Sequence, residues 1–262
     1  MFTPRSRILV FVCDIQERFR PLIHKFEGLE LSAGTLLQAT AIFQDYHHTY
    51  TEKHQQENDN KNQINSFPYA QITDVYVTEQ YPKALGKTSP LLQSYLYPSS
   101  SSTTVSSSSS GTSTSSTSHS HNNNKHPLLC RNVYTEEKLQ FSMISDKIHQ
   151  KINQHIYNSS PSLIKAILFG METHVCIQQT ALDLRKLNID VILPVDAISS
   201  QREVDRNTAL HLLQSKGCTL TTTESLIFDY MKGANYPQFK SISKLMVNYG
   251  TAIPAQERLT FY

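Results

Sequence analysis

The sequence between residues 163 and 184 reads LIKAILFGMETHVCIQQTALDL. Its first part, Leu163–Gly170, is almost entirely apolar, which is typical of a strand buried on both faces of a parallel sheet. After a short turn, apolar residues recur at helical spacing over Thr173–Leu187. This stretch therefore predicts a strand that leads directly into a helix, the repeating unit of an α/β fold.

The same alternation of strands and helices extends along the rest of the chain. Arg7–Asp14 is another continuous apolar run, and it ends in a charge. Further strands are predicted at Thr73–Thr78, Asn132–Tyr134, Asp190–Pro194 and Cys218–Thr222, and further helices at Leu29–Gln44, Ile144–Ile156, Glu203–Gln214, Ser225–Met231 and Pro237–Met246. Ser145 is the expected N-cap of its helix. We predict a three-layer α/β/α sandwich around a parallel sheet of about six strands.

Two polar segments interrupt this pattern. Residues 97–127 consist almost entirely of Ser, Thr, Asn and His. They cannot bury enough apolar surface to offset their ordering entropy, so we predict disorder there. Residues 45–70 carry many polar residues and no apolar stripe, which predicts a solvated loop. The remainder has the size of one domain, so residues 1–262 are expected to form a single domain with two inserts.

The composition of the whole chain excludes several classes of partner. The formal net charge is +2, which predicts neither nucleic acid nor an anionic membrane as a ligand. No apolar run has the length of a membrane-spanning helix. The four cysteines include no close pair, a usage that fits a reducing compartment. We expect a cytoplasmic protein. The alternative, a mitochondrial address, is unsupported: the first residues are basic, but a cleavable presequence would have to include the strand that begins at Arg7.

Three residues stand where chemistry is expected, each with an ordinary alternative. Cys176 begins a helix, where the helix dipole and backbone N–H groups favour a thiolate, but a buried structural cysteine is an equal alternative on position alone. Asp14 ends a strand and could serve as a base, although a loop-capping aspartate is the more common case. Cys13 should face the other side of that strand and belong to the core. An isolated lysine such as Lys138 is usually a solvated surface residue.

Several motifs in the same order resemble the isochorismatase-like hydrolases, and in particular the eukaryotic isochorismatase domain-containing proteins. The resemblance covers most of the chain outside the two inserts. It is carried by Asp14-Ile-Gln16, Val77-Thr-Glu-Gln-Tyr-Pro-Lys83, Lys138 with Phe141-Ser142-Met143, Phe169–Leu184, Val195–Ser200, Val204-Asp-Arg206 and Thr222–Ser225.

The resemblance implies a role for each residue that matches a motif. Asp14 would be the general base, Lys138 the cation beside it and Cys176 the nucleophile. The backbone amides of Glu172 and Cys176 would form the oxyanion hole, and a non-proline cis peptide would join Met171 to Glu172. Lys138 is assigned because it stands four residues before Ser142, as the family's catalytic lysine does.

Residues that differ from the family's motifs exclude some of the activities found in that family. The metal-binding nicotinamidases carry aspartate and histidine after the second strand, whereas residues 79–82 read EQYP, so no metal is expected. True isochorismatases lack the cysteine nucleophile that Cys176 supplies. Residues 199–202 read SSQR instead of the expected Ser-Ser-Arg order, which puts a contact by Arg202 in doubt. No phosphate-binding glycine motif is present, so no nucleotide cofactor is expected.

The sequence therefore predicts a cofactor-independent cysteine hydrolase. It would cleave a small amide, imide or related C–N bond through a covalent Cys176 intermediate, with Gln16, Phe19, Tyr81 and Phe141 as candidates to line the pocket. The resemblance also implies a homo-oligomer. The alternatives are a non-catalytic binding protein on the same fold, or a thiol redox sensor for which no resolving cysteine is evident in the sequence.

Overall fold

The computed structural model describes residues 2–57, 67–98 and 128–252. Its strands are β1 (Arg7–Cys13), β2 (Gln71–Gln80), β3 (Val133–Lys138), β4 (Ile164–Met171), β5 (Asp190–Pro194), β6 (Ile198–Ser199) and β7 (Thr219–Thr221). Its α-helices are α1 (Phe26–Glu57), α2 (Pro82–Leu85), α3 (Pro90–Leu96), α4 (Asp146–Tyr157), α5 (Gln178–Lys186), α6 (Glu203–Ser215), α7 (Thr223–Met231) and α8 (Phe239–Ala252).

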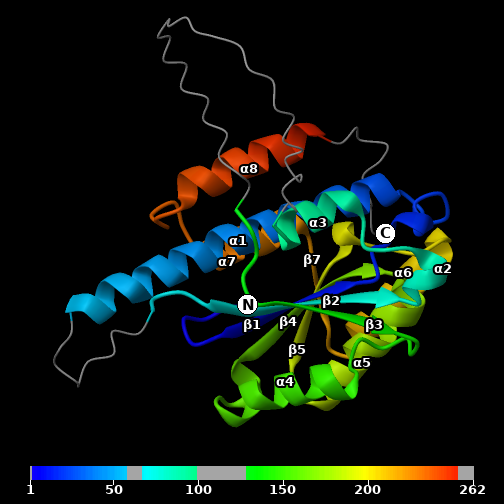
Figure 1. Cartoon of the computed structure of the whole chain (residues 1–262), viewed down its shortest axis with the longest axis horizontal. Coiled ribbons are helices and arrows are strands. Elements are labelled where there is room, and N and C mark those ends of the chain that lie inside the picture. The colour runs from blue at the N-terminus through cyan, green and yellow to red at the C-terminus, as the bar shows by residue number, and fades with distance from the viewer. Residues whose placement is uncertain (1, 58–66, 99–127, 253–262) are drawn as a thin grey trace, which may run out of the picture.

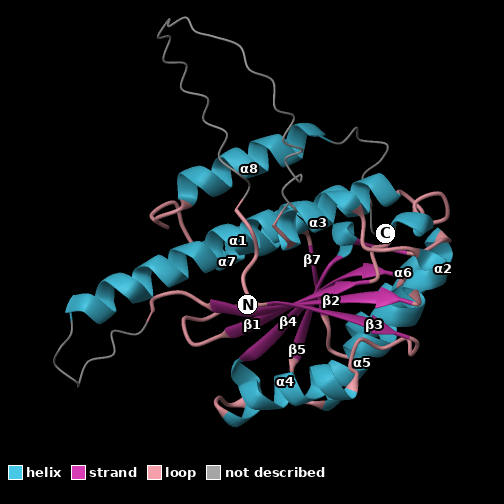
Figure 2. Ribbon diagram, viewed as in Figure 1, coloured by secondary structure: helices cyan, strands magenta, loops and turns pink. Residues whose placement is uncertain are grey.

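The strands form one parallel sheet in the order β3-β2-β1-β4-β5-β7, and the short strand β6 also pairs with β4. Helices α1, α3, α7 and α8 lie on one side of the sheet, while α4 and α5 lie on the other (Figures 1 and 2). The predicted three-layer α/β/α architecture is therefore confirmed. In a sheet of this kind, ligands bind at the carboxyl ends of the strands.

The pairing register places several polar residues on one face of the sheet. Cys13 pairs with Thr78 across β1 and β2, and Gln80 pairs with Lys138 across β2 and β3. Side chains alternate along a strand, so Thr78 and Gln80 point to the same face of the sheet. The residues paired with them, Cys13 and Lys138, point to that face as well. The carboxyl ends of three adjacent strands thus present polar side chains to one region.

The prediction of a solvated loop at residues 45–70 is wrong for its first part, because α1 continues to Glu57. The ring of Tyr46 contacts the rings of Phe67, Tyr69 and Tyr236, so aromatic contacts dock this part of the helix where no aliphatic stripe exists. Residues 58–66 lie outside the described residues. None of the described helices combines the length and apolar composition needed to cross a membrane.

The boundaries of other elements also differ from those predicted from the sequence. The predicted strand remnant at Asn132–Tyr134 is the full strand β3, which carries Lys138 as its last residue. Ser145 caps α4 as predicted, because its side chain accepts a hydrogen bond from the Ile148 N–H. The start of the second insert is ordered: the Tyr97 hydroxyl is hydrogen-bonded to Thr135 Oγ1. The rest of that insert, residues 99–127, lies outside the described residues.

Candidate active site

Asp14 follows β1 directly and adopts a left-handed backbone conformation, with φ 52°. Aspartate tolerates this region better than most residues. The side chain is buried, and its two oxygens have different partners. Thr78 Oγ1 donates to Oδ1 at 2.8 Å, and Lys138 Nζ donates to Oδ2 at 2.7 Å. The structure therefore brings Asp14 and Lys138 together as a buried ion pair.

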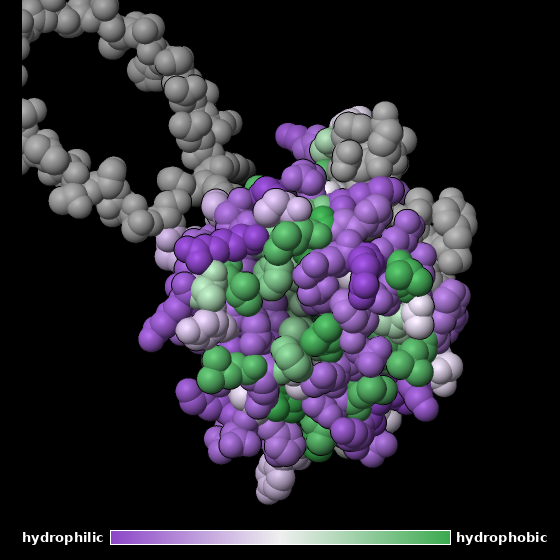
Figure 3. Space-filling model, turned by 90° about the vertical axis from the view of Figure 1, so that its right-hand side faces the viewer, coloured by the Kyte–Doolittle hydropathy of each residue, from purple (hydrophilic) through white to green (hydrophobic). Residues whose placement is uncertain are grey.

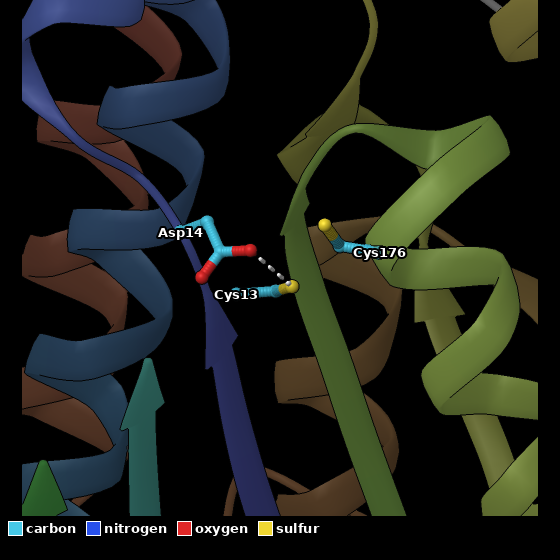
Figure 4. Close-up of side chains that lie close together, drawn as sticks. All are labelled: Cys13, Asp14 and Cys176. Atoms are coloured by element: carbon cyan, nitrogen blue, oxygen red, sulfur yellow. Dashed lines mark hydrogen bonds between the residues drawn. The ribbon is translucent and has the colours of Figure 1, made fainter. Parts of the chain in front are cut away.

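Cys13 shares this cluster, which corrects the expectation that it faces away from Asp14. Its thiol donates to Asp14 Oδ2 at 3.6 Å (Figure 4). The alternation of a strand would place adjacent side chains on opposite faces, but the positive φ of Asp14 ends that alternation. The pKa of Cys13 is raised well above its ordinary value by burial, by a hydrogen bond to Cys176 and by the charge of Asp14. Cys13 is thus a core residue that also contacts the site.

The Lys138 ammonium lies at the centre of the cluster and is almost completely buried. Five acceptors lie within hydrogen-bond distance of its three N–H groups: Asp14 Oδ2 at 2.7 Å, Gln80 Oε1 at 2.7 Å, the Phe141 carbonyl at 2.9 Å, the Gln140 carbonyl at 3.2 Å and Cys176 Sγ at 3.7 Å. Burial by itself lowers the pKa of Lys138. Electrostatic interactions with Cys13, Asp14 and Cys176 outweigh burial, so the pKa lies above its ordinary value and the side chain remains a cation.

Cys176 lies in a single π-helical turn, η3 (Thr173–Ile177), which precedes α5. π-Turns of this kind are frequent at functional sites. The Thr180 hydroxyl donates to the Cys176 carbonyl at 2.6 Å and accepts from the Met143 N–H at 2.9 Å. The thiol-bearing turn is therefore tied to the loop that follows Lys138.

The backbone that leads into this turn is unusual. Gly170 has φ 124°, and a Cβ added there would lie 2.1 Å from the Cys13 carbonyl oxygen, so only glycine allows β4 to approach β1 this closely. The peptide bond that joins Met171 to Glu172 is cis, as the resemblance predicted. The two residues proposed for the oxyanion hole, Glu172 and Cys176, both belong to the segment that follows this bond.

Residues that follow β6 hold the same turn from the other side. Ser200 Oγ accepts from the Thr173 N–H at 3.0 Å and lies 3.0 Å from His174 Nδ1. The Glu172 carboxylate accepts from the Gln201 N–H at 3.2 Å. The sequence analysis did not assign a role to Ser200, although it is the last residue of the matched motif Val195–Ser200.

The four residues predicted to line a pocket occupy different environments. Gln16 is fully buried, and its amide exchanges hydrogen bonds with the backbone of Gln80 at 2.8 and 3.0 Å. It therefore fixes the exit of β2 beside that of β1. Phe19 is half-buried against the core, whereas Tyr81 and Phe141 are about half exposed, at 49% and 50%.

Sequence reasoning missed the contacts of Thr78, Gln80 and Cys13 with the site. The signal that could have found them is the period of two along β2, combined with a register that aligns its carboxyl end with those of β1 and β3. A single sequence contains the period but not the register, so these contacts could not be assigned.

The arrangement combines a thiol, a carboxylate and an ammonium ion. Among the described residues, one group offers three potential metal-ligand atoms within 4.8 Å of one another: Cys13, Asp14 and Cys176. The Lys138 ammonium is already bound to Asp14 and Cys176 in the same space, and it would repel a dication there. The donor set thus suits thiol chemistry better than a resident metal ion.

Comparison with known proteins agrees with the fold and the motifs. The sequence model of the isochorismatase domain matches residues 124–225. The chain is 28% identical over 243 residues to Isochorismatase domain-containing protein 2 of Xenopus laevis, covering 93% of this chain and 84% of that protein. It is also 28% identical over 243 residues to the Secreted isochorismatase effector Isc1 of Phytophthora sojae, covering 93% and 85%.

Among solved structures, the MAR1 Ribonuclease from Caenorhabditis elegans superposes with a TM-score of 0.65 at 25% sequence identity, covering 99% of this chain and 97% of that one. The family model, the relatives and the shared architecture lead to the same assignment. The chain is similar to the isochorismatase-like hydrolases, and in particular to the eukaryotic isochorismatase domain-containing proteins.

Proposed function

We propose that the protein hydrolyses a small amide, imide or related C–N bond through a covalent intermediate on Cys176. One observation carries this proposal: the Lys138 ammonium lies within hydrogen-bond distance of both the Asp14 carboxylate and the Cys176 thiol. A thiol and a carboxylate that both contact one buried cation, and lie within 4.8 Å of each other, provide a nucleophile, a base and a stabilising charge.

The reaction would begin with transfer of the Cys176 thiol proton to Asp14. The thiolate then attacks the carbonyl carbon, and the backbone amides of Glu172 and Cys176 donate to the developing oxyanion. As the C–N bond breaks, the leaving nitrogen takes the proton from Asp14 and a thioester remains on Cys176. Asp14 next removes a proton from water, and the resulting hydroxide cleaves the thioester to release the acid.

The buried cation would act electrostatically throughout this cycle. Lys138 stabilises the Asp14 carboxylate before proton transfer and the Cys176 thiolate after it. Its anchoring to the carbonyls of Gln140 and Phe141 means that it need not move between the two states. Such preorganised charge is effective because it requires no rearrangement during the reaction.

The surroundings favour a small substrate with an apolar part. Tyr81 and Phe141 are half exposed, and Leu139 is 76% exposed, all close in sequence to groups that contact Lys138. Figure 3 shows apolar side chains interspersed with hydrophilic ones across the face that the strand ends reach. We propose that part of this apolar surface binds substrate and part is covered by a second copy of the chain in a homo-oligomer.

The test is a hydrolysis screen of small amides and imides with the full chain. Cys176→Ser should lower kcat/KM by at least about 1,000-fold. Cys218→Ser, which replaces a buried cysteine outside the cluster, is the matched control and should remain active. When the protein turns over a slow substrate, mass spectrometry should detect the acyl group attached to Cys176. Turnover by Cys176→Ser at the wild-type rate would refute the covalent mechanism.

Names of the relatives supply two further substrates for that screen. One solved relative is described as a ribonuclease and one sequence relative as a secreted isochorismatase effector. An RNA oligonucleotide and isochorismate should therefore be included. Cys176-dependent cleavage of either would replace the amide proposal, and binding without turnover of any candidate would favour the non-catalytic alternative.

The organisation and compartment of the protein are part of the same proposal. We infer one domain over residues 1–262 and a reducing, cytoplasmic location, supported by four free cysteines that are all buried. Deletion of residues 99–124 should leave a single cooperative melting transition. Loss of that transition would contradict the single-domain inference, and multi-angle light scattering of the same samples would test the oligomer.

A further inference from the structure

The cluster contains a second sulfur that the proposed hydrolysis does not use. Cys13 Sγ and Cys176 Sγ lie within 4.8 Å of each other, and the Asp14 carboxylate lies within the same distance of both. The two thiols come from different elements, the end of β1 and the turn η3, and Figure 4 shows both sulfur atoms directed into the same space.

We propose that Cys13 resolves oxidation of Cys176, so that a peroxide converts the pair into an intramolecular disulfide that reversibly blocks the nucleophile. The inference goes beyond the proposed hydrolysis and does not depend on it, because it requires only that Cys176 react with a peroxide.

The geometry supports formation of the disulfide within one chain. A disulfide requires an S–S distance of about 2.05 Å, so side-chain rotation together with a small shift of the η3 turn must close the gap between the sulfurs. The close approach of Gly170 to the Cys13 carbonyl already holds β4, and the turn that follows it, against the end of β1. The two elements are therefore preorganised for the bond.

The other cysteines occupy different surroundings. The Cys130 thiol donates to the Leu37 carbonyl at 3.3 Å, and burial raises its pKa to about 12. Cys218 immediately precedes β7, and burial raises its pKa to about 11. Neither belongs to the group of close donor atoms found among the described residues. Cys13 is thus the partner that the fold provides for Cys176.

The chemistry balances with a peroxide as the oxidant. The Cys176 thiolate attacks one peroxide oxygen, the O–O bond breaks, and hydroxide leaves while Cys176 becomes a sulfenic acid. Cys13 then gives its thiol proton to Asp14, which accepts its hydrogen bond at 3.6 Å, and the Cys13 sulfur attacks the Cys176 sulfur. The S–O bond breaks, hydroxide leaves, and both hydroxides become water on protonation.

The environment assigns different roles to the two thiols. Because burial and its neighbours raise the pKa of Cys13, this residue stays protonated and does not compete for the peroxide. Cys176 receives the hydrogen bond of the Lys138 ammonium, which stabilises its thiolate. Cys176 is therefore the group that is oxidised first, and Cys13 the group that resolves it.

The experiment treats the full chain with hydrogen peroxide, blocks free thiols with iodoacetamide and maps peptides without reduction. We expect a cross-linked peptide joining Cys13 to Cys176, loss of Cys176 alkylation, and full recovery of alkylation after a thiol reductant. The intact chain should lose the mass of two thiol hydrogens. A wild-type chain that yields no such peptide, and instead a Cys176 sulfinic acid that reductant does not restore, would overturn the inference.

Variants distinguish disulfide formation by Cys13 from oxidation of Cys176 that does not involve Cys13. In Cys13→Ala, Cys176 should pass to the sulfinic acid and should not recover with reductant, whereas Cys218→Ser should behave as wild type. If Cys13→Ala fails to fold, Cys13→Ser keeps the size of the side chain and should give the same result. Equal recovery of Cys176 with and without Cys13, or a cross-link between two chains at Cys176, would also refute the proposal.

Discussion

Two buried carboxylates, Asp14 after β1 and Asp74 within β2, have similar sets of partners. Asp14 accepts from the Thr78 hydroxyl at 2.8 Å and from Lys138 at 2.7 Å. Asp74 accepts from the Tyr76 hydroxyl at 3.0 Å and lies 2.6 Å from His155 Nε2. Each carboxylate thus has one hydroxyl and one basic side chain, and both are buried.

The Asp74–His155 pair and the Asp14–Lys138 pair differ in their surroundings. Asp74 stands within the first half of β2, and its partner His155 comes from α4, so the pair joins a helix to the sheet. Asp14 stands beyond the end of its strand, and its partner also contacts a thiol. The same kind of pair therefore joins a helix to the sheet in one place, whereas at the carboxyl edge of the sheet it lies beside a thiol, in the position that the proposed mechanism requires.

The largest expected difference is in activity. Asp14→Asn should lower kcat/KM by about 100- to 10,000-fold because it removes the proposed base. Asp74→Asn should change kcat/KM by less than about twofold, since Asp74 contacts no group of the proposed site. Steady-state kinetics on the two variants measures the contrast, and a similar loss in both would show that the Asp14 effect is only structural.

A second difference is expected in stability. Lys138→Met leaves Asp14 charged and buried without its partner, which should lower the free energy of unfolding by about 3–5 kcal/mol. His155→Phe should cost about 1–3 kcal/mol, because the Asp74 pair is more exposed to solvent and keeps its tyrosine. Urea denaturation measures both.

A double variant sharpens this comparison. Asp14→Asn combined with Lys138→Met removes both charges and should recover most of the stability lost in Lys138→Met, yet remain inactive. No recovery in the double variant would mean that Lys138 stabilises the fold by packing and not by charge.

Alkaline pH should distinguish the pairs to a smaller extent. Because the pKa of Lys138 is raised in the folded state, the unfolded chain loses this proton first as the pH rises. The stabilisation is complete below the unfolded pKa of about 10.5 and decreases above it, by at most about 1.4 kcal/mol per pH unit. The double variant at Asp14 and Lys138 should lack this component, and His155→Phe should keep it. The same dependence of unfolding free energy on pH in the wild type, the double variant and His155→Phe would contradict the assignment of this component to Lys138.

The smallest expected effects concern the two hydroxyls. Thr78→Val and Tyr76→Phe should each cost about 1 kcal/mol of stability through loss of one hydrogen bond. Only Thr78→Val should also lower kcat, because it frees an oxygen of the proposed base. An unchanged kcat in Thr78→Val would show that the Thr78 contact does not position Asp14.

The architecture followed from the sequence because each buried strand is an apolar run bounded by polar or turn residues, as in Leu163–Gly170. The helical continuation over residues 45–57 did not follow, since its docking depends on Tyr46 meeting aromatic rings that come from distant parts of the chain. β6 was missed because a strand of two residues leaves no periodic pattern.

The site was predictable to a different degree. Motif resemblance gave Asp14, Lys138 and Cys176, and the structure brings these three side chains into one cluster. Without the resemblance, the position of the residues in the predicted elements supported only Cys176. A single lysine at the end of a strand that was only partly predicted does not indicate a functional role. The Cys13 contact could not be predicted, since it depends on a positive φ at Asp14 that a sequence does not display.

The position of β3 in the strand order has a kinetic consequence. Among the described strands, β3 is the outermost on its side and pairs with β2, so its hydrogen bonds should open more often than those of the central strand β1. Lys138 ends β3, so each opening would detach the ammonium from Asp14 while the rest of the sheet stays folded. Amide hydrogen exchange should therefore be faster across Val133–Lys138 than across Arg7–Cys13. A ligand that slows exchange in β3 would thereby hold the Lys138 ammonium beside Asp14.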